Sequence, residues 1–313
     1  MNIPIPASVL RPLVRLAARW TFSPSAEWPA IRHRVDWTTA HSPIPSGVAV
    51  SPRVLGGVAA DLHTPRGARS DAIILYLHGG GYATGSRTSH RALVARLAHA
   101  CNVSAYVLAY RLAPEHPCPA AFEDVVSAYR ALLDDGWAGS QILVVGDSAG
   151  AALTLMLAIG ARDELNLPLP AAVGLICPPI EHDVAALATR TNAATDPILT
   201  VGLIRRFFDA YTHESADTSS LQLLQRSLHG LPPMVVEASG RDLLLDDARD
   251  LARRAQKANV RVHYTEHPGQ GHVFHVMAGL TWAANRAVDN IACQLTTELD
   301  RHEYLTSPTG IPE

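Results

Sequence analysis

The sequence is poor in cysteine and has no long apolar run. Its four cysteines are scattered over 313 residues without a CxxC pair, which excludes a disulfide scaffold and argues against a zinc site built on cysteine. Buried, free thiols in a reducing compartment are therefore expected. No apolar run reaches the roughly 18 residues that a membrane span needs. We predict a chain that makes no stable insertion into a membrane.

An excess of charge of one sign is also lacking. The chain has 26 Lys and Arg against 29 Asp and Glu, so its formal net charge is −3. Without an excess of basic residues, the chain lacks the positive charge that binds the phosphates of DNA or RNA, and no nucleic-acid partner is expected. Charged residues make up 18% and apolar residues 48%, which excludes a disordered chain. A chain of this length buries about 75% of its unfolded surface, enough for a large core.

Apolar runs and helical segments alternate along the chain. Runs that are apolar on both faces suit buried parallel strands, and the helical segments between them suit crossover connections. The pattern predicts an α/β fold with a mostly parallel central sheet flanked by helices. The expected strands are residues 72–77, 103–109, 141–145, 172–177, 234–238 and 260–264, and the expected helices are 90–99, 120–134, 149–162, 246–258 and 280–299. Residues 54–62, which Gly56-Gly57 interrupts, are predicted as a strand at an antiparallel edge of the sheet.

Two segments do not fit this alternation, and we predict that they form a helical cap over the sheet. They are residues 1–45 and residues 181–229. Residues 46–180 and 230–300 then make up the α/β core, and residues 301–313 a loose tail.

The first cap segment contains an expected helix over residues 8–20. Its arginines are spaced by four and share one face, opposite an apolar face; the residues are Arg11, Arg15 and Arg19 against Leu10, Leu13 and Val14. Such a helix can lie on a membrane surface or pack on a globular core, and we expect packing on the core. The arginines also interrupt the apolar N-terminus, so no signal peptide is expected.

The segment Gly146-Asp147-Ser148-Ala149-Gly150 has the form G-x-S-x-G and stands between an expected strand and an expected helix. In that context the serine occupies a strained turn that lifts its hydroxyl above the sheet, and small neighbours let the turn close. The following helix points its N-terminus at the site, where negative charge is stabilised. The pattern predicts Ser148 as a nucleophile. The competing interpretation is a plain strand-to-helix turn in which the serine caps the helix.

Three consecutive glycines follow the expected strand 72–77, in His78-Gly79-Gly80-Gly81. Glycines leave no side chain between the backbone N–H groups and a ligand, and loops of this HGGG type supply oxyanion donors in lipases and esterases. We predict donors at Gly80, Gly81 and Ala149, and a structural role for His78. A flexible loop or a phosphate cradle is the competing interpretation, but no G-K-[ST] sequence accompanies the glycines.

A base is expected after the nucleophile, because in such folds the order along the chain is Ser, Asp or Glu, His. His272 is the predicted base. The loop Pro268-Gly269-Gln270-Gly271 follows the last expected strand directly, so it can carry the imidazole over the nucleophile, and apolar residues after His272 can anchor it. His267 and His275 are its rivals.

The acid is expected between the nucleophile and the base. Asp242 is the first carboxylate in the turn after strand 234–238, and we predict it as the acid. Asp246 and Asp247 come one helical turn later and are expected to cap the next helix. In the resulting mechanism the serine attacks a carbonyl, the histidine takes its proton, and the aspartate orients the imidazole.

Four stretches of the sequence resemble the hormone-sensitive-lipase-like esterases of the α/β-hydrolase fold. They are residues 78–82 (HGGGY), 110–117 (YRLAPEHP), 146–150 (GDSAG) and 271–274 (GHVF). The resemblance implies an α/β-hydrolase fold whose cap is built from the N-terminal segment and an insertion. It implies hydrolysis of short- to medium-chain acyl esters, small molecules, without a metal or an organic cofactor. It also implies a homodimer, as in many members, and a bacterial cytoplasmic location.

Two further functions within this resemblance stay open. Residues 175–178 and 196–199 are similar to bacterial acetyl-hydrolases and monoterpene lactone hydrolases of the same family, which would use the same three residues. A non-catalytic ligand receptor, like the plant gibberellin receptors, is a remote alternative, and the retained His272 argues against it. The sequence departs from the family pattern after Asp242, where Leu243 replaces the usual proline.

Substrate contacts are expected from aromatic residues of the cap and of the glycine loop. Phe207, Phe208 and Tyr211 belong to a helix expected over residues 201–211, and Tyr82 follows the three glycines. These four are the candidate substrate-binding residues. Ordinary packing of the rings between cap and core is the competing interpretation.

Overall fold

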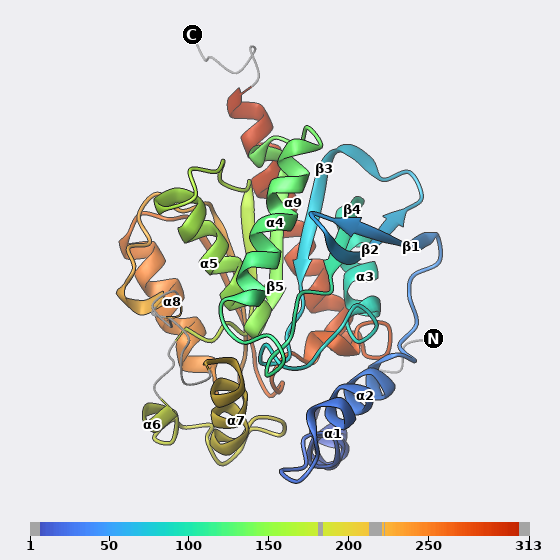
Figure 1. Ribbon diagram of the computed structural model, residues 1–313, viewed down its shortest axis with the longest axis vertical. Helices are drawn as coiled ribbons and strands as arrows, with labels where there is room; N and C mark the ends of the chain where they lie inside the picture. Colours follow the sequence, from blue (N-terminus) through green and yellow to red (C-terminus); the bar gives the residue numbers. More distant parts are fainter. Residues whose placement is uncertain (1–6, 181–183, 213–220, 222, 307–313) are drawn as a thin grey trace.

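The computed structural model describes residues 7–180, 184–212, 221 and 223–306, which form one eight-stranded sheet with helices on both faces (Figure 1). The strand order is β1-β2-β4-β3-β5-β6-β7-β8. The pairs β1–β2 and β2–β4 are antiparallel, and the other neighbouring pairs are parallel, which confirms the predicted sheet. The strands are β1 Val48–Leu55, β2 Val58–Pro65, β3 Arg69–Leu77, β4 Val103–Leu108, β5 Ile142–Asp147, β6 Ala172–Ile176, β7 Met234–Ser239 and β8 Val262–His267.

Residues 54–62 form parts of two strands, so the prediction of a single edge strand there is wrong. Gly56 and Gly57 have φ angles of +58° and +80°, as a two-residue turn between antiparallel strands requires. The chain reverses at these glycines, and Leu55 pairs with Val58. The glycines therefore separate β1 from β2 instead of interrupting one strand.

The sheet carries helices on both faces because its strands bury side chains on both sides. In β3, Ile73 and Leu75 belong to the apolar cluster that includes α4, α5 and α8, whereas Ile74 and Tyr76 belong to the cluster that includes α3 and α9. All four side chains are at most 4% exposed, as a run that is apolar on both faces predicts. These helices are α3 Arg91–Cys101, α4 Ala120–Asp134, α5 Ala149–Asp163, α8 Leu245–Lys257 and α9 Trp282–Thr306.

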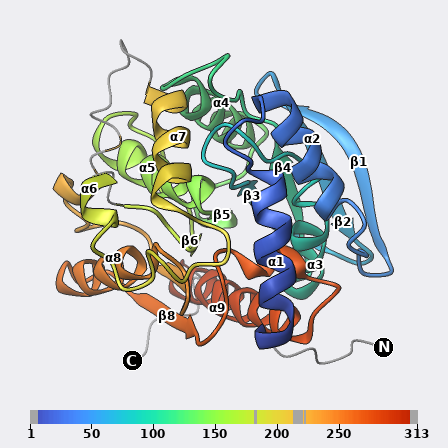
Figure 2. The same ribbon diagram turned by 90° about the horizontal axis from the view of Figure 1, so that it is seen from below.

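The helices of the two predicted cap segments lie on the same side of the molecule, below the sheet in Figure 1 and facing the viewer in Figure 2. Arg206 joins the two segments, because its Nη1 donates to the carbonyl oxygen of Ser23 over 3.2 Å and its guanidinium lies 4.6 Å from the ring centre of Trp28. The cap helices are α1 Ala7–Thr21, α2 Trp28–Thr39, α6 Val184–Leu187 and α7 Val201–Thr212, and the short 3-10 helices are η1 Gly139–Gln141, η3 Leu223–Gln225 and η4 Phe274–Met277.

The helix α9 continues to Thr306, so the start of the predicted loose tail, residues 301–313, is helical. Leu295 and Leu299 are buried in the core and anchor the helix. No glycine or proline stands before Pro308 to end it. Residues 307–313 lie outside the described residues.

The helix α1 packs on the core as expected, but its faces differ from the prediction. Leu10 and Val14 line an internal cavity, whereas Leu13 is 63% exposed. Arg11 lies on the inner side, where its Nη2 donates to the carbonyl oxygen of Gly269 over 3.5 Å. The sequence gives this helix apolar residues on two sides, and only contact with the core decides which side is covered. Among the described residues, no helix is both long enough and apolar enough to cross a bilayer.

Candidate active site

Ser148 stands at the turn between β5 and α5 in the conformation that raises a side chain above a sheet. Its φ is +49° and its ψ is −122°, a strained combination for a residue with a side chain. The turn also needs a small residue after it, because a Cβ at Gly150 would lie 1.9 Å from the carbonyl oxygen of Leu77. Ala149 begins α5, so the N-terminus of that helix adjoins the serine. The turn predicted from G-x-S-x-G is therefore present.

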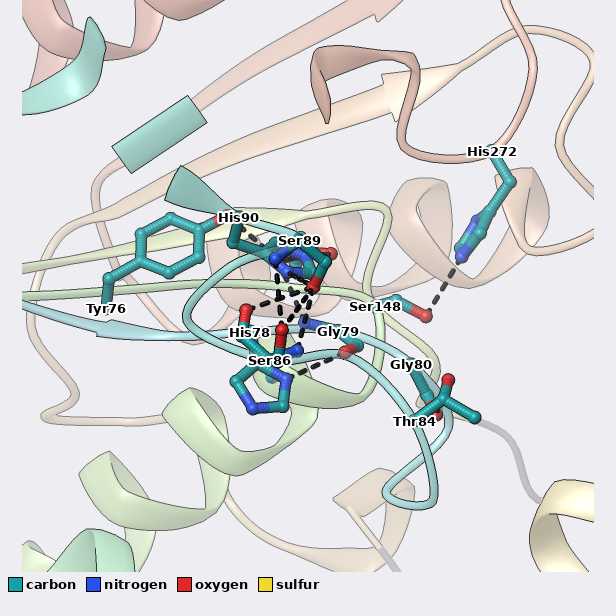
Figure 3. A network of polar contacts seen from close by, with 12 residues as sticks. Tyr76, His78, Gly79, Gly80, Thr84, Ser86, Ser89, His90, Ser148 and His272 are labelled. Atoms are coloured by element: carbon teal, nitrogen blue, oxygen red, sulfur yellow. Dashed lines mark hydrogen bonds and ion pairs between the residues drawn. The ribbon is translucent and has the colours of Figure 1, made fainter. Parts of the chain in front are cut away.

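Three side chains from separate loops form one continuous chain of hydrogen bonds. Nε2 of His272 lies 2.9 Å from Oγ of Ser148, the contact drawn in Figure 3, and Nδ1 of His272 lies 2.8 Å from Oδ2 of Asp242. Asp242 is 1% exposed and His272 is 7% exposed, so water reaches these three hydrogen-bonded side chains mainly at the serine. The structure thus brings together the three residues singled out from the sequence.

The Asp242 carboxylate controls the protonation of His272. Burial by itself would lower the pKa of this imidazole, but the carboxylate and its hydrogen bond raise the pKa well above the ordinary value of 6.5. A histidine whose cation is stabilised in this way is a stronger acceptor for the proton of a serine hydroxyl.

The two rival histidines lie beside a different carboxylate. Nε2 of His267 contacts Oε2 of Glu237, and Nε2 of His275 lies 3.8 Å from the same oxygen. Asn290 donates to the other oxygen of Glu237 over 3.0 Å. His267 and His275 stand on either side of the loop that carries His272. The buried Glu237 holds His267, whereas the ring nitrogens of His275 make no hydrogen bond with the described residues.

The two aspartates that follow Asp242 also point elsewhere. Asp246 and Asp247 occupy the first turn of α8, as expected for residues that favour a helix N-terminus. Asp247 is buried, where it binds Arg190 over 2.5 Å and accepts the N–H of Ile180 over 3.1 Å. Neither residue contacts His272 among the interactions of the described chain.

Polar groups of the second cap segment hold the turn of Asp242, and the sequence analysis did not identify them. Asn192 donates to the carbonyl oxygen of Asp242 over 2.9 Å, and Asp196 accepts the N–H of Leu243 over 2.7 Å. The second bond needs an N–H that a proline at position 243 would lack. Burial and the neighbouring Asp242 raise the pKa of Asp196 to about 6. Residue spacing gave no signal for these contacts, because they join segments that are distant in the sequence.

The glycine loop after β3 presents its backbone to the cavity in front of Ser148. Gly80, Gly81 and Ala149 all line that cavity, and within the described part of the chain the N–H groups of Gly80 and Gly81 donate to no other protein group. A side chain would not fit at Gly81, since a Cβ there would lie 2.3 Å from the ring of Phe207. These N–H groups are free to stabilise negative charge on a carbonyl oxygen bound at the serine.

Asp147 ties this loop to the turn of Ser148, a link that the sequence analysis missed. Its Oδ1 accepts the N–H of Gly79 over 3.0 Å and the hydroxyl of Tyr76 over 2.8 Å, and its Oδ2 lies 3.2 Å from Nε2 of His90. Burial alone would raise the pKa of Asp147, but its partners, His90 foremost, lower the pKa below its ordinary value. The only sequence signal is its place inside the G-x-S-x-G motif.

His78 braces the same loop, as its predicted structural role requires. It is buried, it stacks on Tyr110 with ring centres 4.2 Å apart, and its Nδ1 lies 2.9 Å from the carbonyl oxygen of Gly79. Burial lowers the pKa of His78 to about 3, so the ring is neutral near neutral pH.

A chain of polar contacts continues from the loop to the cap. Oγ of Ser89 lies 2.9 Å from Nδ1 of His90 and accepts the N–H of Ser86 over 2.8 Å (Figure 3). The hydroxyl of Ser86 donates to a carboxylate oxygen of Asp36 in α2. The glycine loop is therefore connected to a cap helix as well as to the nucleophile turn.

A mainly apolar cavity of about 350 Å³ lies between the cap and this site. It is lined by α1 and α7, by the glycine loop, and by Ser148 and His272. Of the aromatic candidates, Tyr82, Phe207 and Phe208 line it. Tyr211 does not, because it is fully buried behind Tyr82, with the two rings stacked 3.9 Å apart. For Tyr211 the structure thus favours ordinary core packing.

Two groups of described side chains are close enough to hold a metal ion: Cys177 with Asp242 and His272, and Glu237 with His267 and His275. In each group a carboxylate already binds a histidine. Burial raises the pKa of Cys177 to about 11, so its thiol stays protonated and is a poor metal ligand. All four cysteines are free thiols, as expected from their spacing, and three are buried. The expectation of burial is wrong for Cys293, which is exposed on the outer face of α9.

Comparison with known sequences gives one family match. The profile of a family described as alpha/beta hydrolase fold matches residues 74–276. An acetyl-hydrolase of Streptomyces hygroscopicus is 37% identical over 237 residues, which are 74% of this chain and 78% of that protein. An esterase of Acinetobacter venetianus is 28% identical over 94% of this chain and 95% of its own length.

Solved structures that resemble this chain are also esterases or their relatives. An esterase from the bacterial hormone-sensitive lipase family is 31% identical, with a TM-score of 0.87 over 94% of this chain and 98% of that one. The protein EstE5, in crystals soaked with p-nitrophenyl butyrate, is 30% identical, with a TM-score of 0.86 over 94% of this chain and 98% of that one. The resemblance noted from the four sequence motifs is confirmed.

Proposed function

Because this chain belongs to the α/β-hydrolase fold family, we propose that it is a serine carboxylesterase acting through Ser148, His272 and Asp242. The observation that carries the proposal is the unbroken chain of hydrogen bonds from Asp242 Oδ2 to Ser148 Oγ, which ends in an apolar cavity. The names of the relatives support an ester as the substrate, since they are called esterase and acetyl-hydrolase.

The first half of the reaction acylates the serine. Oγ of Ser148 attacks the ester carbonyl carbon while Nε2 of His272 takes the hydroxyl proton. The carbonyl oxygen becomes an oxyanion, to which the N–H groups of Gly80, Gly81 and Ala149 donate. The bond to the alcohol oxygen breaks, the alcohol leaves with the proton from His272, and Ser148 carries the acyl group.

The second half releases the acid. His272 takes a proton from a water molecule, and the resulting hydroxide attacks the acyl carbon. The bond between that carbon and Oγ breaks, and the proton on His272 returns to the serine oxygen. Asp242 keeps the imidazole in the required tautomer and stabilises its cation in both halves.

The cavity bounds the substrate class. Its apolar lining, which includes Tyr82, Phe207 and Phe208, suits an acyl chain or an apolar alcohol. The cavity volume of about 350 Å³ is at the small end of the range for ligand-binding sites. We therefore propose short- to medium-chain acyl esters. An acetyl-hydrolase is the second candidate, favoured by the name of the Streptomyces relative. The homodimer and the cytoplasmic location stay predictions.

Hydrolysis of p-nitrophenyl esters from acetate to palmitate tests the proposal. We expect a maximum at butyrate to octanoate, and a loss of kcat/KM on the order of 10⁴-fold or more in Ser148→Ala. The matched control is Ser127→Ala, which removes the exposed hydroxyl of an α4 residue and should leave the rate unchanged.

A maximum at acetate would favour the acetyl-hydrolase. Hydrolysis that survives Ser148→Ala would overturn the nucleophile, and a folded protein inactive on all esters would redirect the search to lactones.

A further inference from the structure

The outer face of α1 carries a continuous stripe of exposed apolar side chains. Val9, Leu13, Leu16 and Trp20 are spaced to lie on one side of the helix, and they are 59%, 63%, 67% and 48% exposed. We call these four residues the α1 stripe. Figure 2 shows α1 on the near side of the cap, in front of the core. Large apolar side chains exposed together mark an interaction surface, whereas single ones are ordinary.

The exposed apolar surface extends beyond α1. Trp37 of α2 is 59% exposed, and its ring meets that of Trp20 edge to face with centres 5.8 Å apart. At the start of α9, Leu280 and Trp282 are 50% and 51% exposed. Among the described residues, five of the eight exposed large apolar side chains therefore belong to α1 and α2.

The stripe lies on the same helix as part of the substrate cavity. Leu10, Val14 and Ala18, on the inner side of α1, line the cavity that holds Ser148. An apolar molecule at the α1 stripe is thus separated from the cavity by the thickness of one helix. A surface in that position can deliver apolar substrate as well as bind it.

The basic side chains beside the stripe are Arg19 of α1 and Arg34 of α2. Arg11 and Arg15 point away from it and donate to the carbonyl oxygens of Gly269 and Thr195. The helix α1 itself contains no acidic residue. Arg34 of α2 reaches Trp20, with its guanidinium 5.0 Å from the ring centre. Exposed tryptophan, aliphatic side chains and arginine together are typical of helices that lie at a membrane surface, where the rings sit at headgroup level and arginine meets phosphate.

We propose that the α1 stripe docks this protein reversibly on an anionic lipid surface. The four apolar side chains would enter the boundary between headgroups and acyl chains, with Arg19 and Arg34 at the level of the phosphates. A second copy of the chain fits less well. A twofold contact sets the same patch against itself, so it would oppose cationic α1 to cationic α1. The proposal concerns binding alone and does not depend on the proposed hydrolysis.

Sedimentation with vesicles tests this binding directly. The protein carries Ser148→Ala, so that no lipid is consumed, and the vesicles are phosphatidylcholine alone or an equal mixture with phosphatidylglycerol. We expect binding to the mixed vesicles that is at least about tenfold stronger than to phosphatidylcholine and that weakens at high salt. The double variant Leu13→Ser, Leu16→Ser should lose about tenfold or more of the binding to mixed vesicles.

A matched control distinguishes binding through the α1 stripe from nonspecific adsorption through any exposed apolar side chain. Val54 is 71% exposed on β1, so Val54→Ser removes an equally exposed apolar side chain outside the cap and should leave vesicle binding unchanged. Hydrolysis of soluble p-nitrophenyl butyrate by the Leu13→Ser, Leu16→Ser protein with Ser148 intact should also be unchanged, since neither leucine lines the cavity. No binding to either vesicle, or equal loss in the Val54 variant, would overturn the proposal. The proposal would also be overturned if the Ser148→Ala protein is a dimer in solution that does not bind vesicles, and if the changes Leu13→Ser and Leu16→Ser dissociate that dimer.

Discussion

The backbone N–H of Gly79 donates to Oδ1 of Asp147 over 3.0 Å. The residue before the proposed nucleophile therefore holds the loop that carries the proposed oxyanion donors. Because both parts of the site share one buried carboxylate, a shift of the loop relative to Ser148 would have to break a charge-assisted hydrogen bond in the core.

Asp147→Asn tests this coupling. The amide keeps the volume but not the charge that faces His90, so we expect kcat to fall about 10- to 100-fold with a small change in KM, since the loop acts mainly on the transition state. The melting temperature should fall as well. The control is Asp289→Asn, which removes the charge of a surface carboxylate paired with Arg96 and should change neither quantity. An unchanged kcat in Asp147→Asn would show that the loop is positioned without this link.

Asp242→Asn tests the assignment of the acid. An amide at this position would leave the imidazole in the wrong tautomer, and we expect kcat to fall by about 10⁴-fold with the fold intact. Asp246→Asn is the matched variant one helical turn later, and it should retain nearly full activity because Asp246 is exposed beside Arg249. A larger loss in Asp246→Asn than in Asp242→Asn would reverse the assignment.

The pH dependence follows from the raised pKa of His272. The base must be neutral to accept the serine proton, so kcat/KM should rise with pH along an acid limb whose midpoint lies above 6.5. Stability should move in the opposite direction. A group whose pKa is raised by folding stabilises the protein fully below its unfolded pKa, and this contribution disappears as pH rises through the folded pKa. Rate profiles and thermal melts across this range give both trends, and an acid limb below 6.5 would contradict the Asp242–His272 pairing.

Treatment with EDTA should leave ester hydrolysis unchanged. The proposed mechanism uses the oxyanion donors and the histidine for the work that a metal would otherwise do. Adding zinc to the treated protein serves as the complementary measurement, because a metal bound at Asp242 and His272 would occupy the base and inhibit the reaction. A loss of activity on chelation that zinc restores would instead require a metal in the reaction.

Features that depend on neighbouring residues could be predicted from the sequence. Apolar runs predicted β3 to β8, and burial on both faces leaves that pattern in interior strands such as β5, β6 and β7. The edge strand β8 is only half-buried and begins two residues later than predicted. The turn at Ser148 was predictable because its strain and its need for Gly150 are local. The hairpin at Gly56-Gly57 was equally local, yet it was read as a break within one strand, since an interruption and a reversal use the same residues.

Contacts between distant segments could not be predicted in the same way. The spacing left His267, His272 and His275 as rivals. Only the packed loop shows that the outer two lie beside Glu237 while the middle one faces the serine. Asp196 approaches Leu243 from the cap, and no periodicity records that contact.

The sequence by itself determined the alternation of strands and helices after the first hairpin, the raised turn at Ser148 and the glycine loop, because short-range sterics and burial patterns specify them. The tertiary structure alone decided which histidine hydrogen-bonds to the serine and that Asp147 accepts the N–H of Gly79. It also decided that Leu13 faces outward while Leu10 faces the cavity. The first two depend on how the loops of the core pack together and the third on how the cap packs on the core, and both are set by the packing of the whole chain.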